Sequence, residues 1–328
     1  MMFSKSLRGY LQTGFFGVLA LSFSGGGLAA EPIPNPAQAA QAVFSGKMPG
    51  RTEGALTFAH FSDQHMGQNA GLPDSFRFSP ELTRRALIEV ATIYPRAAFA
   101  VFTGDNASLK DFDKAAAGSP VKVFGVPGNG ERGTYLGPWC IVDTVRREDY
   151  PPAPWRDDRS IKEIGNSLFI FLDSALPRAH EGALSWDQMR WVHETLSRTA
   201  DKHVFLFLHH GDGWMMNQDW FDDMLNWHRP RFRSIVVCTG HDHSAQNAST
   251  LRQSVGYLRA GSIQNGYYRV FHIFEDHIIT YTRNSSAYAA MAAEAGGVKA
   301  ATGTPPFNPL ASEPIVIATG PRPAAGPV

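Results

Sequence analysis

Histidine, aspartate and asparagine follow short apolar runs at five places in this sequence. In chain order these residues are Asp63, His65, Asp105, Asn129, His209, His210, His241 and His243. Their carboxylate, imidazole and amide groups are the ligand types that suit first-row divalent metals of intermediate hardness. Any one pair is a weak signal, because Asp-x-His and Gly-Asp pairs also occur in ordinary turns. The five groups together, each behind an apolar run, predict a metal centre.

The most specific fragment is Gly240-His-Asp-His243. Two histidines that are two residues apart in an extended segment point to the same side, as chelation of one ion requires. His209-His210 is less specific, because this pair could also be a capped strand end.

The apolar runs that precede these residues are short enough to be buried strands. They cover residues 56–61, 98–102, 121–126, 168–172, 204–208 and 234–238, each five or six residues long. Residues 267–274 and 277–281 read as two further strands joined by a hairpin at Glu275-Asp276. In open α/β sheets, ligands bind beyond the carboxyl ends of the strands, so the five polar segments are expected to converge.

Helical patterns separate several of these strands. Ser79-Pro80 predicts a helix start, after which Leu82, Ala86 and Val90 share one face. Ser185 predicts the cap of a second helix whose buried face carries Met189, Val192 and Leu196. The alternation of strands and helices predicts an α/β layered protein whose sheets are partly parallel and partly antiparallel.

Composition excludes several classes of protein. The 328 residues include 30 basic and 30 acidic side chains, and 43% are hydrophobic. The chain can therefore bury a sizeable core, and it lacks the excess positive charge of a nucleic-acid-binding domain, so no nucleic-acid partner is evident. Two cysteines exclude a disulfide-rich scaffold and a four-cysteine zinc site. If the chain is exported, as the N-terminal segment described next indicates, a Cys140–Cys238 disulfide is permitted.

The N-terminal segment has the features of a secretory signal peptide. Lys5 and Arg8 precede a short apolar stretch at 14–23, and small residues follow up to Ala30. We expect cleavage after Ala29 or Ala30 and export to the periplasm or beyond, with no membrane span left; an uncleaved anchor is the alternative. Residues 31–54 then read as a linker, 55–284 as the globular domain, and 285–328 as a low-complexity, mostly disordered tail with a short strand at 314–318. Oligomeric state is not predictable from these features.

The ordered pattern D-x-H, G-D, G-N-x-E, H and G-H-x-H over residues 56–283 resembles that of the calcineurin-like metallophosphoesterases. Phe171-Leu-Asp-Ser174 and His180-Glu-Gly182, followed by Gln188, resemble the branch of that family that acts on cyclic nucleotides and glycerophosphodiesters. The purple acid phosphatase branch is less similar, because it has a tyrosine three residues beyond Asp105, where this chain has Ser108, and lacks the His65 position. The resemblance implies a four-layer α/β/β/α sandwich with mixed sheets and two divalent or trivalent metal ions of the Mn, Fe or Zn type.

The resemblance also implies a role for each site residue. Asp63, His65 and His243 would bind one ion, Asp105 would bridge both ions, and Asn129, His209 and His241 would complete the second. The implied reaction is hydrolysis of a small phosphodiester or phosphomonoester by attack of a metal-bridging hydroxide. His210 is expected to face the substrate or to support its neighbour.

One position departs from the family pattern. Gly130 stands where the family has a histidine that contacts the phosphate and is a candidate proton donor, and such donors contribute typically ~10²–10⁴-fold to the rate. Glu131 and His210 are the substitutes we consider, and Glu131 could equally be a solvated loop carboxylate. Two hypotheses therefore stand: a phosphoesterase, or a metal-binding scaffold or binding protein with impaired catalysis. Two groups of residues after the His209 loop, Trp214-Met215-Met216 and Trp220-Phe221, either roof the substrate or pack in the core of the following helix.

Overall fold

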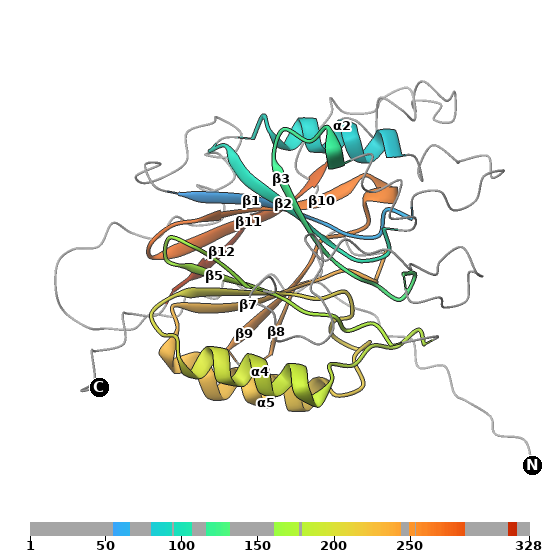
Figure 1. Ribbon diagram of the computed structural model, residues 1–328. Coiled ribbons are helices and arrows are strands. Elements are labelled where there is room, and N and C mark those ends of the chain that lie inside the picture. The colour runs from blue at the N-terminus through green and yellow to red at the C-terminus, as the bar shows by residue number, and fades with distance from the viewer. Residues whose placement is uncertain are drawn as a thin grey trace, which may run out of the picture.

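Two six-stranded sheets lie face to face in the computed structural model, with helices on their outer surfaces (Figure 1). The structure describes residues 55–65, 80–93, 95–106, 116–131, 161–176, 179–243, 249–252, 254–285 and 314–319. The expected signal peptide and linker, most of the tail, and Cys140 lie outside these residues. Among the described helices, none has the length and apolar character needed to cross a bilayer.

The first sheet is mixed. Its strands, in spatial order, are β12 (Ile315–Ala318), β11 (His277–Asn284), β10 (Tyr267–Ile273), β1 (Leu56–Phe61), β2 (Ala97–Thr103) and β3 (Lys122–Val126). Strands β1, β2 and β3 run parallel, whereas β10 pairs antiparallel with β1. The three loops that follow the parallel strands therefore leave the sheet at one edge.

The second sheet is built in the same way. Its strands, in spatial order, are β4 (Ile161–Ile164), β5 (Ser167–Phe171), β6 (His203–Phe207), β7 (Ser234–Thr239), β9 (Val255–Arg259) and β8 (Ser249–Arg252). Strands β5, β6, β7 and β9 are parallel, and the two edge strands are antiparallel to their neighbours. Strands β6 and β7 lie next to each other, so the loops that follow them are also neighbours.

Helices cover the outer face of each sheet. Helix α2 (Pro80–Val90) packs on the first sheet, and α4 (Trp186–Ser197) and α5 (Gln218–His228) pack on the second (Figure 1). Helix α4 begins where predicted, because the Ser185 side chain accepts a hydrogen bond from the backbone of Gln188. Two short 3-10 turns, η4 (Arg229–Arg231) and η5 (Ile263–Asn265), complete the described helical elements.

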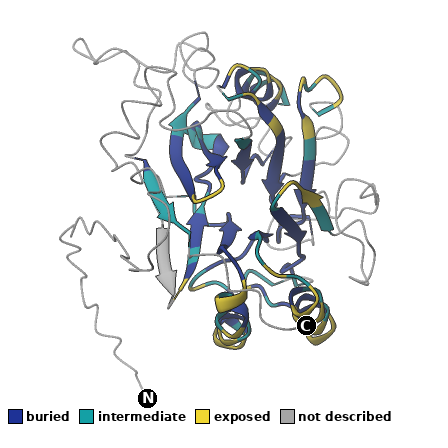
Figure 2. Ribbon diagram, turned by 90° about the vertical axis from the view of Figure 1, so that its left-hand side faces the viewer, coloured by how far each residue is buried: buried dark blue, intermediate teal, exposed yellow. Residues whose placement is uncertain are grey.

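Aromatic side chains fill the space between the two sheets. The ring of Phe58 stacks on Phe99 and Phe271, with centroids 5.2 and 4.5 Å apart, and meets Phe205 of the opposite sheet edge-on. Figure 2 shows that the strands are largely buried while the helices are exposed on their outer sides. This rigid interior fixes the strand ends that carry the polar loops.

The fold class is the predicted α/β/β/α sandwich. All eight expected strands are present within a residue or a few of their predicted ends, and the expected short strand in the tail is confirmed as β12. Because β12 pairs with the otherwise open edge of β11, the sheet extends beyond the predicted domain boundary at 284. Strands β4, β8 and β9 were not predicted. Cys238 is buried between the sheets, and Cys140, the other half of the permitted bridge, lies outside the described residues.

Candidate metal centre

The five polar loops meet at one edge of the sandwich, as expected from the parallel strand ends. Within the first sheet, the backbone N–H of His65 donates to the carbonyl of Asp105 at 2.8 Å. Within the second sheet, the N–H of Gly240 donates to the carbonyl of His209 at 2.9 Å. The sheets are joined where the N–H of His241 donates to Asp63 Oδ2 at 3.0 Å. Residues far apart in the sequence are thus held by short backbone contacts.

Four of the expected ligand residues have left-handed backbone conformations. The φ angles of Asp63, His65, Asp105 and His241 are +57°, +49°, +52° and +69°. Such conformations are costly for residues other than glycine and persist only where surrounding contacts enforce them. Among the described non-glycine residues only Asp201, in the turn before β6, shares this feature. The chain therefore bends sharply after these strands, at the positions where the metal ligands were predicted.

The first group of side chains comprises Asp63, His65, Asp105 and His243, whose ligand atoms all lie within 4.8 Å of one another. His243 Nε2 is 3.2 Å from Asp63 Oδ1 and 3.0 Å from His65 Nε2. His65 Nε2 is 3.9 Å from both Asp63 Oδ1 and Asp105 Oδ2. The His243 side chain is 41% exposed and the other three are nearly fully buried, so His243 forms the solvent side of this group.

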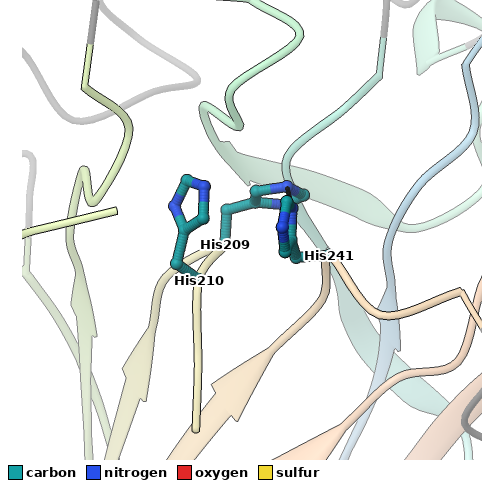
Figure 3. A group of neighbouring side chains, drawn as sticks. All are labelled: His209, His210 and His241. Atoms are coloured by element: carbon teal, nitrogen blue, oxygen red, sulfur yellow. Dashed lines mark hydrogen bonds between the residues drawn. The ribbon is translucent and has the colours of Figure 1, made fainter. Parts of the chain in front are cut away.

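The second group gathers around His209 at the end of β6. His209 Nε2 lies 3.0 Å from Asn129 Oδ1 and 3.1 Å from His241 Nδ1. Its Nδ1 atom is 2.6 Å from the carbonyl oxygen of Thr103, which fixes the orientation of the ring. Figure 3 shows the rings of His209 and His241 next to each other, with the ring of His210 to one side. Asn129 and the two ring nitrogens therefore face one point.

Asp105 connects the two groups. Its Oδ1 atom is 3.5 Å from His209 Nε2, and its Oδ2 atom is 3.9 Å from His65 Nε2. One carboxylate thus presents one oxygen to each group. The predicted bridging position of Asp105 agrees with this geometry.

The charges of the site favour bound cations. Burial by itself would raise the pKa of Asp63, but the hydrogen bond with His243 lowers it to about 2. Burial would lower the pKa of His209, but the adjacent carboxylate of Asp105 raises it to about 9. The pKa of His243 is also raised, since Asp63 outweighs the effect of burial. The carboxylates are therefore ionised, and positive charge is stabilised beside them.

The donor set fits a metal centre. Two pairs of ring nitrogens, His65 with His243 and His209 with His241, are 3.0 and 3.1 Å apart. Each pair can share only one proton, whereas ligand nitrogens at about 2.0–2.1 Å from a common ion would have a similar separation. Burial, followed by the charge of His209, lowers the pKa of His241 to about 3, so this ring is neutral and has a free lone pair. Together with two carboxylates and an amide oxygen, these residues can hold first-row transition ions.

Gly130 packs directly against the bridging carboxylate. Its backbone N–H donates to Asp105 Oδ1 at 2.6 Å, and a Cβ atom at this position would lie 2.9 Å from the same oxygen. No side chain could be added here without a shift of Asp105. With Asp105 in this position, the loop accepts only a glycine at position 130, where the family has a histidine.

Glu131 is not the solvated loop carboxylate that we considered. It is only 3% exposed, and its oxygens accept hydrogen bonds from the backbone N–H groups of Asp105, Asn106 and Gly128. Burial, followed by the negative charge of Asp105, raises its pKa to about 7. These contacts make Glu131 a positioning residue that ties the loop after β2 to the loop after β3. A role as proton donor stays a prediction.

His210 is fully buried and does not line the surface. Its Nδ1 atom is 2.9 Å from Ser174 Oγ, and the ring packs so closely on Gly182 that no Cβ would fit there. The ring centroid is 4.7 Å from that of His241, and a ring nitrogen lies close enough to His209 and His241 to join them around an ion. These contacts agree with the expected support of its neighbours, and a catalytic role stays a prediction.

Two contacts of the site were not predicted from the sequence, although His180 and Trp214 themselves were singled out there. Arg259, on the unpredicted strand β9, donates from Nη1 to Asp242 Oδ2 at 2.6 Å and from Nη2 to the carbonyl of Asp212 at 3.0 Å. It ties the loop after β6 to the loop after β7. The second feature is the contact of His180 and Trp214 with the ring of His241. Neither has a local signal in the sequence, because both depend on which loops become neighbours.

One curated protein and several solved structures are similar to this chain. A probable glycerophosphodiester phosphodiesterase, GpdQ, from Arcobacter nitrofigilis is 24% identical over 134 residues, which are 38% of this chain and 45% of that protein. The chain thus spans less than half the length of this curated relative. No family model matches the sequence.

Solved structures with a similar fold include a purple acid phosphatase from yellow lupin (Lupinus luteus; TM-score 0.48, 12% identity, 71% of this chain and 52% of that one). PhoD has a TM-score of 0.44 and 13% identity, over 70% of this chain and 66% of that one. Vps29 of Entamoeba histolytica, solved in complex with Zn²⁺, has a TM-score of 0.34 and 11% identity, over 70% of this chain and 92% of that one.

The two sheets with outer helices and a buried His/Asp cluster at the strand ends define a metallophosphoesterase-type α/β fold. The order of the cluster residues along the chain and the curated relative agree with this class. In its fold and in this cluster the chain is similar to the calcineurin-like metallophosphoesterases.

Proposed function

We propose that this protein is an exported, dinuclear-metal phosphoesterase that hydrolyses a small phosphodiester or phosphomonoester. The relative from Arcobacter supports a phosphodiester, in line with the glycerophosphodiester and cyclic-nucleotide branch that the sequence resembles. The site is formed by loops, and the chain as a whole has no excess of basic residues. A small phosphoester suits such a site better than a long polyanion.

The position of Asp105 is the observation that carries this proposal. Its two oxygens face two separate groups of imidazoles, at 3.5 Å from His209 and 3.9 Å from His65. A single structural ion would need only one of these groups. A carboxylate shared by two groups is the arrangement that holds two ions close together, as in two-metal phosphoesterases.

Some side chains of this site would bind the metal ions, and others would orient these ligands. When bound, two such ions supply Lewis acidity at the phosphoryl oxygens and acidify water. Asp63 and Asp105 supply the negative charge that holds the cations, and the buried imidazoles and Asn129 complete their coordination. Glu131 fixes the backbone of Asp105, and the carbonyl of Thr103 fixes the ring of His209. These contacts preorganise the ligands before substrate arrives.

Among the residues that the structure describes, none is well placed to protonate the leaving group. Gly130 has no side chain, Glu131 is engaged by three backbone N–H groups, and His210 is buried against Ser174 and Gly182. We therefore expect good activity only with leaving groups that depart without a proton. The same observation favours the second candidate, a metal-binding protein whose catalysis is impaired.

Hydrolysis of bis(p-nitrophenyl) phosphate separates these two candidates. The full chain would be stripped with chelator, reloaded with Mn²⁺ and compared with Asn129→Ala, which loses the amide oxygen 3.0 Å from His209 Nε2. Asn226→Ala, on α5, is the matched control. Metal-dependent turnover that is lost only in Asn129→Ala supports the phosphoesterase. Two bound ions by elemental analysis without turnover would instead support the binding protein.

Export is a separate part of the proposal, supported by the basic, apolar and small-residue segments of residues 1–30. We expect protein recovered from the periplasm or the medium to begin after Ala29 or Ala30, as measured by N-terminal sequencing. Full-length protein that stays in the cytosol would contradict this part alone.

A further inference from the structure

A tryptophan stands directly beside the metal centre. The indole of Trp214 has its ring centroid 4.6 Å from that of His241, and the imidazole of His180 is 4.5 Å from His241 and 5.0 Å from Trp214. Three rings from three different loops therefore pack against one another. His180 and Trp214 are both half-buried.

Two backbone hydrogen bonds fix the loops that carry these rings. The N–H of Gly182 donates to the carbonyl of Trp214, and the N–H of Met216 donates back to the carbonyl of Gly182, both at 2.8 Å. Gly182 in turn packs on the buried ring of His210. Trp214 is therefore held on a rigid support that is continuous with the metal centre, as a recognition residue requires.

The indole is not used by a stacking partner in the described part of the protein. It meets His241 at an interplanar angle of 76° and His180 at 81°, so neither imidazole lies parallel to it. No hydrogen bond of its side chain is formed with the described residues. A core tryptophan normally satisfies its N–H, whereas among the described residues the Trp214 side chain has neither a hydrogen bond nor a ring stacked parallel to it.

We propose that Trp214 is the stacking platform for an aromatic group of the substrate, so that the enzyme selects aryl phosphoesters over alkyl ones. This inference rests on the proposed function and adds its substrate class. It resolves the alternative left open by the sequence in favour of a substrate contact for Trp214 rather than a place in the helix core.

The absence of a side chain at Gly130 points to the same class by a different route. A phenol has a pKa near that of tyrosine, about 10, whereas an aliphatic alcohol lies much closer to water, at about 15.7. A phenolate can therefore leave without a proton donor, and an alkoxide depends on one. An aromatic platform would bind the aryl group, and an aryl ester does not need the missing histidine at position 130. Both features suit aryl esters.

Binding of two non-hydrolysable phosphonates tests the platform without requiring turnover. We would measure the affinity of the manganese-loaded full chain for phenylphosphonate and methylphosphonate by calorimetry. Stacking of a planar ring on an aromatic side chain contributes about 1–3 kcal/mol, so the wild type should prefer phenylphosphonate by ~5–150-fold. Trp214→Leu should abolish this preference, and Trp214→Phe should retain part of it.

Trp220→Ala is the matched control, because Trp220 is an exposed tryptophan on α5 that contacts Trp186 instead of the metal centre. Equal affinity of the wild type for both phosphonates would overturn the proposal even if Trp214→Leu failed to fold. Equal weakening of both ligands by Trp214→Leu would also overturn it, since that result indicates a structural role. A selective effect on phenylphosphonate without hydrolysis of any ester would preserve the platform and refute the proposed function.

Discussion

The contact between Gly130 and Asp105 gives a quantitative prediction for Gly130→Ala. The added Cβ would lie 2.9 Å from Asp105 Oδ1 and 3.3 Å from its Cγ, closer than such atoms normally approach. Gly130 is not among the glycines with positive φ, so the backbone itself accepts alanine without strain. The clash must therefore be relieved by movement of the carboxylate that connects the two groups of ligands.

The expected cost is a loss of metal affinity. A shift of a few tenths of an ångström weakens the hydrogen bond from the Gly130 N–H, now 2.6 Å, and misplaces both oxygens. Loss of such supporting contacts typically lowers metal affinity ~10–100-fold, or about 1.4–2.7 kcal/mol. Gly130→His, which places the family's histidine here, has the same Cβ and should weaken metal binding as well, rather than restore a general acid.

Calorimetric titration of chelator-stripped protein with Mn²⁺ measures this loss directly. Gly118→Ala is the control, because nothing lies within 4 Å of the corresponding Cβ. Wild-type affinity in Gly130→Ala would refute the steric argument. Normal metal binding in Gly130→His, together with faster hydrolysis of alkyl esters, would show that the loop accepts the histidine and that its absence is not imposed by Asp105.

Three further predictions concern stability. Burial, followed by the charge of Arg283, lowers the pKa of His272 from 6.5 to about 3, so only the unfolded state takes up this proton between those values. The contribution of His272 to the free energy of unfolding should therefore fall by about 1.4 kcal/mol per pH unit as the pH drops from 6.5 toward 3, and His272→Gln should show a shallower acid slope in denaturant titrations. In Gly240→Ala the new Cβ would lie 1.7 Å from Ser62 Oγ; we expect a large fall in Tm, and an unchanged Tm would mean that the loops after β1 and β7 separate easily. Glu131→Gln replaces an acceptor oxygen with an amide that faces backbone N–H groups, and should cost about 1.5–3 kcal/mol per disrupted bond in chemical unfolding; a neutral effect would indicate that Glu131 is protonated in the native state.

Much of the architecture follows from local sequence pattern. Runs such as 56–61 and 234–238 are too short and too apolar to be anything but buried strands in a chain of this composition, and both are strands in the structure. Strand β4 was missed because its sequence, Ile-Lys-Glu-Ile, is half-exposed and has no continuous apolar run. Strands β8 and β9 were missed for a related reason, since β9 includes Gly256 and ends on a charged residue.

The residues that could bind a metal were also evident in the sequence, because residue type and position after a strand are local properties. Only the tertiary structure decided how they act together. Asp63 and His241 are 178 positions apart and meet through a side-chain contact between the two sheets, and Asp105 faces both groups because Gly130 leaves room for it. The burial of Glu131 and the position of Trp214 against His241 likewise arise from loops that become neighbours on folding. Periodicity reports which face of an element is buried, whereas the partner of a loop side chain is set by the packing of distant strands, and no local pattern encodes that.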